Sequence, residues 1–535
     1  MATLAVPLAM TLACLAPRFR RHVLRLLPLA PLPALLAAVL GPADMVVVFP
    51  QPFRMTLMLD LPGAILLGAA GLLWAAAGIY ASSYMRGTRE PVRFAVSWLL
   101  CLTGSIGLFI VADLASFYLL FTMASLAAYG LIVHEESERA FLASSIYVAL
   151  ALVGEAFLLL AFVMLATASP DPNPLIHEVV RSLPVSAHRD TILGLLLLGC
   201  ALKLGLVPLH IWLPLAHPAA PMPASAVLSG VLVKAGAIGL IRFLPFEAPL
   251  SDWGNTLIAI GLITAYWGVV VGLTQYEAKV ILAYSTVSQM GLVAAIAGAG
   301  LSVGDAEAPN LVAYYGVHHM LAKGSLFLAI GILTATGATK SRPILLLTAV
   351  LAISLGGLPL TSGALAKLAS KPMFGYGIVS WLVTLAAVGS TVLMLHFLAI
   401  VRREPAADPD AVAPRDQLIP WLIVAGASLT IPWMLYPGLS GNTIRGALQP
   451  ASLWKSAWPV GVGILLALAL RDRRGDLPTI PQGDIIGLIG PLIRATSRGG
   501  KGIERADGML QMWPVAGTLL AGITILLVAA FVSGG

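Results

Sequence analysis

Residues 201–243 of this 535-residue chain read ALKLGLVPLHIWLPLAHPAAPMPASAVLSGVLVKAGAIGLIRF. Lys203 and Lys234 stand in this stretch within runs of apolar residues, where burying an ammonium group is costly. Pro208 and Pro214 interrupt the first run, and proline frees backbone carbonyls that can face ions or water at membrane depth. The stretch therefore predicts a broken membrane helix with a buried lysine, followed by a second helix that carries another.

Composition extends this prediction to the whole chain. Hydrophobic residues make up 59% and charged residues only 11%, with a mean hydropathy of +0.92, whereas soluble domains are roughly 25% charged. The alternating ten-residue segments of a transmembrane barrel do not occur. We predict an all-α polytopic membrane protein with about 14–16 transmembrane helices. Sixteen candidate spans lie near 2–16, 24–41, 62–84, 94–112, 114–133, 140–167, 191–213, 223–241, 255–275, 280–301, 309–337, 343–368, 373–401, 418–437, 457–470 and 510–532.

The distribution of basic residues predicts an orientation. If the N-terminus is outside the cytoplasm, the cytoplasmic loops hold 21 Lys and Arg residues and the opposite loops hold 7, as the positive-inside rule expects. We therefore expect a multi-pass protein of a bacterial inner (plasma) membrane with both termini outside the cytoplasm. The net charge of +7 needs no nucleic-acid partner. The first span precedes its basic residues, so we expect a retained helix and not a cleaved signal peptide.

Four basic residues remain after the loops are counted, and all are lysines inside predicted spans: Lys203, Lys234, Lys323 and Lys367. Lysine, unlike arginine, can lose its proton when it is desolvated. The set favours a proton relay over snorkelling to the interface or a static buried pair. Pro359 interrupts span 12 near Lys367, five spans after the first lysine-bearing break. Because five is odd, this spacing predicts an internal repeat of inverted topology.

Several segments resemble one family of membrane proteins. The stretch from Lys203 to Arg242 is similar to the central signature of the antiporter-like subunits of respiratory complex I, membrane-bound hydrogenases, formate hydrogenlyase and Mrp-type sodium/proton antiporters. Further similarity lies in GIYASSYMRG, YEAKVILAYSTVSQMGLV, YYGVHHMLAKGSLFLAIGIL and GGLPLTSGALAKL. The resemblance covers roughly residues 60 to 400.

The resemblance implies fourteen core helices with two inverted five-helix repeats, spans 4–8 and 9–13, and broken helices 7 and 12. It also implies a polar axis of lysines, histidines and waters at the membrane midplane. On this basis Lys203 is the switching proton carrier and Lys234 connects it towards the centre. Lys323 follows, with His319 on the same helix face, and Lys367 exchanges protons with one side.

One departure from the family concerns an acid. The fifth helix of relatives usually carries a glutamate that pairs with the seventh-helix lysine, and Thr122 stands at the matching position. Glu155, deep in span 6, could replace that partner, or it could be a carboxyl satisfied by backbone or water. The missing acid puts complete proton pumping in doubt. It also places the chain nearer the hydrogenase-type or Mrp-type relatives than complex I proper.

Other polar residues carry narrower predictions. His319 is expected to relay protons and His210 to gate access near Pro208. His318 and His396 are expected to serve packing. Asp113 is expected to cap a helix.

These observations predict three regions: N-terminal transmembrane helices (1–60), an antiporter-like proton-conducting core (61–405), and C-terminal transmembrane helices with a basic cytoplasmic loop (406–535). We expect no cofactor or metal site, and a non-catalytic ion-translocating subunit of an oxidoreductase of the NADH:quinone or hydrogenase type. Expected partners are other membrane subunits, a redox or zinc-containing peripheral protein and the lipid bilayer. The alternatives are the membrane subunit of a zinc-protein-coupled inorganic carbon uptake system, a member of an Mrp-type sodium/proton antiporter, and a scaffold that has lost the path.

Overall fold

The computed structural model describes residues 1–48, 54–171, 173–470 and 480–485. The chain divides into two compact units, Met1–Gln482 and Gly483–Gly535, and the account below concerns the first. The predicted span near 510–532 and most of the basic loop 471–509 lie outside the described residues.

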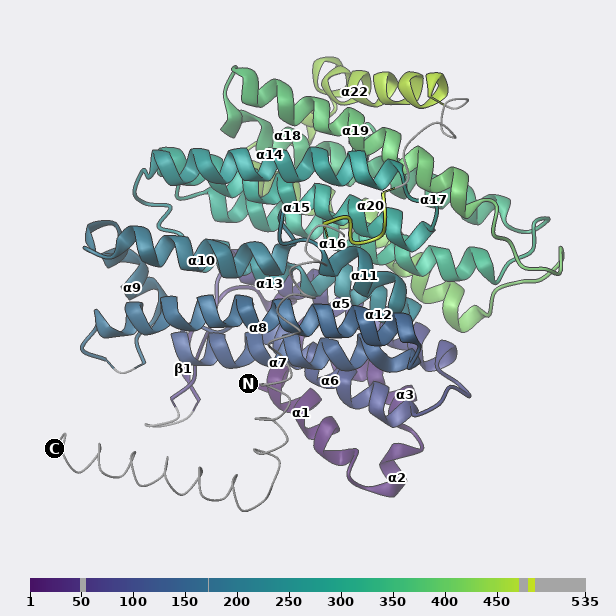
Figure 1. The fold of residues 1–535 in the computed structure, drawn as a ribbon, viewed down its shortest axis with the longest axis horizontal. Coiled ribbons are helices and arrows are strands. Elements are labelled where there is room, and N and C mark those ends of the chain that lie inside the picture. The colour runs from purple at the N-terminus through teal and green to yellow at the C-terminus, as the bar shows by residue number, and fades with distance from the viewer. Residues whose placement is uncertain (49–53, 172, 471–479, 486–535) are drawn as a thin grey trace, which may run out of the picture. The chain divides into compact units, whose positions relative to one another are not determined.

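The first unit is almost entirely helical, and its long helices run roughly parallel to one another in Figure 1. The helices before the first break are α1 (Ala2–Ala13), α2 (Pro17–Arg20), α3 (Val23–Leu26), η1 (Leu27–Leu29), α4 (Leu32–Leu40), α5 (Leu61–Tyr84), α6 (Pro91–Gly107), α7 (Leu114–Ile132), η2 (Val133–Glu135), α8 (Glu138–Thr167), α9 (Ile176–Ser182), η3 (Leu183–Val185) and α10 (Arg189–Leu204). Those that follow are α11 (Trp212–Ala219), α12 (Met222–Val227), η4 (Leu228–Leu232), α13 (Lys234–Phe243), α14 (Ser251–Leu273), α15 (Ala278–Val303), α16 (Ala308–Thr334), α17 (Arg342–Gly356), α18 (Ser362–Ser370), η5 (Lys371–Phe374), α19 (Ile378–Val401), α20 (Arg415–Ser440), α21 (Ile444–Ala447) and α22 (Pro450–Ala469). A short antiparallel hairpin of β1 (Ala43–Val47) and β2 (Thr56–Leu59) precedes α5.

The prediction of a polytopic helical membrane protein is confirmed. Within the described residues, eleven helical segments are long and apolar enough to cross a membrane, and three shorter apolar helices accompany them. Each predicted span up to residue 470 coincides with a helix or an interrupted helix.

Two helices are broken at corresponding places. The series α6, α7, α8, α10–α11 and α12–α13 is followed by α14, α15, α16, α17–α18 and α19, and the fourth member of each series is interrupted. Gly205 ends α10 with φ of 73°, and Gly357 ends α17 with φ of 100°. In both cases the N–H of the residue after this glycine donates a hydrogen bond to the carbonyl five residues earlier. The two bonds are Leu206 N to Ala201 O and Leu358 N to Ile353 O. Both breaks therefore begin with the same glycine-dependent helix end, as expected of a repeated unit.

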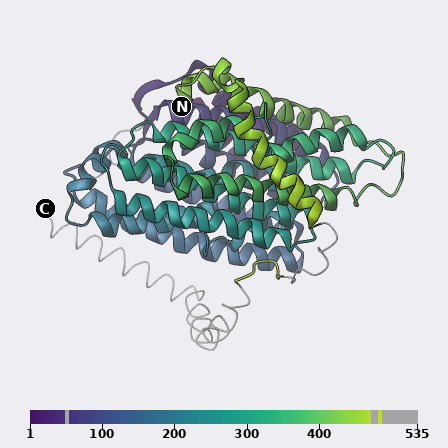
Figure 2. The ribbon, with the colours of Figure 1, turned by 90° about the horizontal axis from the view of Figure 1, so that it is seen from above.

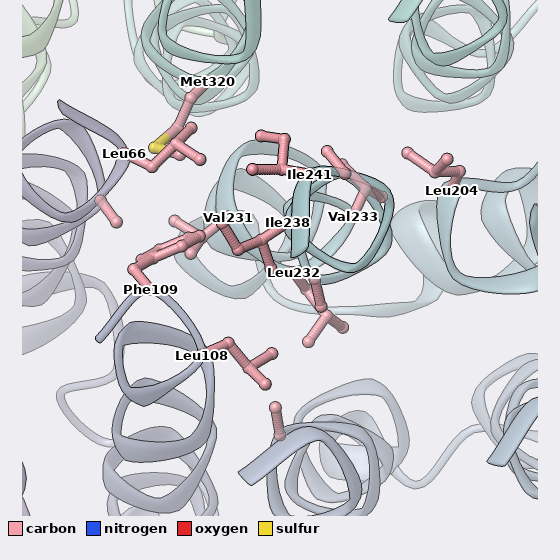
Figure 3. Packing of buried hydrophobic residues seen from close by; sticks show 14 of the residues in the cluster. Leu66, Leu108, Phe109, Leu204, Val231, Leu232, Val233, Ile238, Ile241 and Met320 are labelled. Atoms are coloured by element: carbon pink, nitrogen blue, oxygen red, sulfur yellow. The ribbon is translucent and has the colours of Figure 1, made fainter. Parts of the chain in front are cut away.

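Span 8 differs from its prediction as one uninterrupted helix. A π-helical turn, η4, separates α12 from α13 and ends at Leu232, two residues before Lys234. Apolar side chains from several elements surround this turn, including Leu66 and Met320 (Figure 3). A Cβ on Gly230 would lie 2.3 Å from the Leu73 side chain, so the turn needs glycine to fit against α5. One-residue π insertions are frequent at functional sites.

Helices α14 and α15 touch along their backbones. Gly254, Gly261 and Gly268 recur every seven residues on α14, and a Cβ on each would lie 2.5–2.6 Å from a backbone atom of α15. Small residues allow membrane helices to approach this closely. The contact fixes the position of α15, which carries hydroxyl and carbonyl groups of the site described below.

Asp113 caps α7, as predicted. Its carboxylate accepts hydrogen bonds from Ser116 N at 2.9 Å and from Thr56 N at 2.7 Å, and Asn173 Nδ2 donates to it at 2.9 Å.

The helices that follow the two five-member series pack against the second series, with α20 on α16 and α22 on α19. Figure 2 shows α22, in yellow-green, crossing its neighbours at an angle.

Candidate functional site

The four lysines predicted from the sequence come from four different helices. Lys203 ends α10, Lys234 begins α13, Lys323 lies within α16 and Lys367 lies on α18. Lys203, Lys234 and Lys323 are each at most 5% exposed, and Lys367 is half-buried. Since an ammonium group in this environment needs polar contacts, the groups around each lysine are informative.

Lys203 contacts the neighbouring helices α7 and α8. Its Nζ donates to Ser125 Oγ at 2.7 Å and to Tyr147 OH at 3.2 Å. It also lies 5.3 Å from the centre of the Phe121 ring, within cation–π range. Because Lys203 is in the last turn of α10, the helix dipole also favours its positive charge.

The acid expected beside Lys203 is replaced by hydroxyl groups. Ser125, one turn after Thr122, makes the contact from α7. Glu155 is buried on α8 and interacts electrostatically with Lys203. Within the described residues, however, it forms no ion pair with Lys203, and its Oε1 has no hydrogen-bond partner. Ser125 could have been found from the sequence, because residues three apart share a helix face.

Lys234 follows the π-helical turn in the chain, and Lys323 lies on α16, which packs against that turn. Lys234 Nζ is hydrogen-bonded directly to His319 Nδ1 of α16. Lys323, one turn further along α16, donates to Leu282 O of α15 at 2.8 Å and to Ser285 Oγ. The predicted sharing of one α16 face by His319 and Lys323 thus places two titratable groups between α13 and α15.

Lys367 lies at the second break. Its Nζ donates to Leu355 O at 2.8 Å, a carbonyl near the C-terminal end of α17. His318, expected to serve packing, is buried, and its Nδ1 lies 2.8 Å from Ser362 Oγ at the start of α18. His318 therefore contacts the second break, whereas His319 contacts Lys234, because adjacent helix residues point about 100° apart.

The remaining predicted histidines are also buried. His210 lies in the first break, with its ring centre 6.2 Å from that of Tyr284. The Nε2 atom of His396, on α19, lies 2.7 Å from Gln275 O, within hydrogen-bond distance.

Two residues near the axis were not anticipated from the sequence. His217 on α11 is fully buried, and neither ring nitrogen has a hydrogen-bond partner among the described residues. Lys279 was counted as a loop residue, but it lies in the first turn of α15 and donates to Pro218 O and Ala220 O at the end of α11. Lys279 and His217 interact electrostatically, so α11 brings a fifth lysine close to the axis.

Taken as chemistry, the site is a series of groups that can each hold a proton. Lys234 and His319 are bonded to each other, whereas Lys203, Lys323 and Lys367 are bonded to hydroxyl and carbonyl oxygens. These oxygens accept from a charged ammonium, and the hydroxyls can also donate to a neutral amine. Such surroundings tolerate both protonation states of a buried lysine.

The sequence profile of the family described as NADH:quinone oxidoreductase/Mrp antiporter, TM, matches residues 111–394. Hydrogenase-4 component B of Escherichia coli strain K12 is 31% identical over 304 residues, which are 53% of this chain and 44% of that protein. One of the Na(+)/H(+) antiporter subunits of Bacillus subtilis strain 168 is 29% identical over 414 residues, 72% of this chain and 47% of that protein. The chain thus spans less than half the length of these curated relatives.

A solved structure shares the fold. A chain in the structure of the Mrp complex from Dietzia sp. DQ12-45-1b superposes with a TM-score of 0.71 at 20% identity, covering 86% of this chain and 99% of that chain. The resemblance noted in the sequence is therefore confirmed by both the profile and the architecture.

Proposed function

Because this chain belongs to the NADH:quinone oxidoreductase/Mrp antiporter transmembrane family, we propose that it translocates protons as one membrane subunit of a larger complex. The observation that carries the proposal is the set of three buried lysines and one half-buried lysine on four helices, one of which, Lys234, bonds directly to a histidine. All four lie within the matched residues 111–394. A merely structural core would fill these positions with apolar residues, since burying charge is costly.

The proposed path runs from Lys203, through Lys234 and His319, to Lys323 and Lys367. A proton on one lysine disfavours a second charge nearby, so arrival at one site promotes release from the next. Ser125 and Tyr147 would hold the charged form of Lys203 in place of the carboxylate usual in relatives. Glu155, which interacts electrostatically with Lys203, is proposed to act beside it, and the buried His210 is proposed to gate access near Pro208.

The proposed path does not itself supply the energy for proton movement. That energy would come from a partner protein or from an existing ion gradient. We propose other membrane subunits as partners, and a redox or zinc-containing peripheral protein as the source of drive. The similarity to Hydrogenase-4 component B favours a hydrogenase-type assembly. The setting is proposed to be a bacterial inner membrane.

Sodium/proton exchange is a second candidate. It is favoured by the similarity to the Na(+)/H(+) antiporter protein of Bacillus subtilis, which extends over 72% of this chain. In that case the same lysines would carry the protons, and sodium would follow a separate route.

The experiment starts from native membranes. The assembly is purified in mild detergent, its subunits are identified by mass spectrometry, and it is reconstituted into liposomes with a pH-sensitive dye. We expect proton movement that falls at least tenfold in Lys323→Gln and is unchanged in the loop variant Lys340→Gln. Equal flux in Lys323→Gln and wild type would refute the path, and sodium dependence of the flux would select the antiporter.

A further inference from the structure

A hollow lined by two lysines opens beside the second broken helix. A cavity of about 420 Å³ lies among η5, α19 and α22, with Lys371 and Lys455 in its wall. Helices α19 and α22 lie together at the top of Figure 1, and η5 packs against α19. A second cavity of about 40 Å³ shares Leu368, Lys371, Thr384 and Lys455 with the first and reaches Lys367. The two cavities therefore adjoin, and the smaller one brings Lys367 to its wall; together they are called the passage below.

The charge of this passage is unbalanced. Three lysines line it, and none of the described residues that line either cavity is acidic. Lys371 and Lys455 repel each other: the pKa of Lys371, outside the spanning helices, is lowered by burial and further by the Lys455 charge. Like charges that share a hollow without a counter-ion are unfavourable, and an anion between them would remove the repulsion.

The walls of the larger cavity have the composition of a membrane interface. Trp381 and Trp458 line it with their rings 6.2 Å apart, and Tyr376 at its rim is fully exposed. Tryptophan and tyrosine gather at the level of lipid headgroups. Lys371 and Lys455 lie beside these aromatic residues, although the loops predicted to be non-cytoplasmic hold few basic residues.

We propose that this hollow binds a phosphate oxyanion between Lys371 and Lys455, and that the phosphate is that of an anionic phospholipid headgroup. The two ammonium groups would contact the phosphate oxygens, and the aromatic side chains would hold the upper acyl region. Free phosphate offers the same oxyanion without the apolar part, so the aromatic wall favours the lipid. On the proposed function, the bound anion would lie at the outer mouth of the path to Lys367.

The test measures binding and not transport, so its failure would leave the proton path untouched. The purified full chain is delipidated in detergent and titrated with phosphatidylglycerol, phosphatidylcholine or inorganic phosphate. Native mass spectrometry counts bound lipid and thermal melting reports stabilisation. The test variant is Lys371→Gln/Lys455→Gln, and the control is Lys340→Gln/Arg445→Gln, which removes two exposed charges outside the cavity. Lys455→Gln alone, at an exposed position, serves if the double variant melts prematurely.

We expect wild type and control to bind phosphatidylglycerol in preference to phosphatidylcholine, and the test variant to bind it about 25-fold more weakly, roughly fivefold per lysine. Stabilisation by inorganic phosphate alone, lost in the test variant, would keep the oxyanion site and assign it a soluble occupant. Equal retention of phosphatidylglycerol by wild type and test variant, with no effect of phosphate, would overturn the proposal.

Discussion

Replacing Gly268 with alanine should disturb the α14–α15 contact next to the groups that hold Lys323. The new Cβ would lie 2.6 Å from Tyr284 O and 2.7 Å from Ser288 N, whereas an ordinary contact is at least 3.4 Å. The helices would have to separate by about 0.8 Å, the difference between these distances, and overpacking of this kind costs about 1–3 kcal/mol. Because Ser285 lies between the two contacted residues, its hydroxyl would move relative to Lys323.

The assay is thermal melting in detergent, followed by proton flux in liposomes. The matched control is Gly426→Ala on α20, where a Cβ meets nothing within 4 Å. There we expect a gain of about 0.5–1 kcal/mol from helix propensity. Gly268→Ala should melt at a lower temperature than wild type and lose flux, while the control should do neither. If Gly268→Ala were as stable and active as the control, the backbone contact between α14 and α15 would be refuted.

Two further predictions concern single side chains. Ser125→Ala removes a hydrogen-bond acceptor from Lys203. Since a hydrogen bond to a charged group contributes about 1.5–3 kcal/mol, proton flux should fall about tenfold or more. The control Ser145→Ala, at an exposed position, should leave the flux unchanged, and equal flux in the two variants would exclude a role for Ser125. In the turn after α7, a hydrogen bond from Arg93 lowers the pKa of the exposed Glu136 carboxyl below its ordinary 4.5. The stabilisation is therefore present above pH 4.5 and lost as the pH falls through the lowered value, so wild type and Glu136→Gln should differ in Tm at pH 7 and converge in acid; a difference that persists in acid would contradict this.

The fold was predictable because its signals are local or additive. Apolar runs of membrane-spanning length located the helices, and Pro208 and Pro359 located both breaks, where glycines end α10 and α17. The four lysines were identified by subtraction from the loops, and the structure places each of them on a helix. These features depend on composition and spacing, which a single sequence displays.

Features that depend on tertiary contacts were missed. The π-helical turn before Lys234 is stabilised by packing against α5 and α16, and no residue type within the turn predicts it from the sequence. Lys279 reads as a loop residue until the end of α11 is brought beside it. Glu155 was expected either to replace the missing partner of Lys203 or to be satisfied by backbone or water, and the hydrogen bonds to Lys203 come from hydroxyl groups of α7 and α8. Spacing could have suggested Ser125, which shares a helix face with Thr122, but it does not identify Tyr147, which comes from another helix.

The central claim is that the buried groups form one proton path, and the direct contact between Lys234 and His319 tests it. The measurement is proton flux in liposomes for Lys234→Gln, His319→Gln and the double variant, each checked for native melting. Residues acting in one step are non-additive, so each single change should lower the flux and the double variant should lose no more than the more damaging single. Unchanged flux in either single variant, or two losses that simply multiply, would contradict the account.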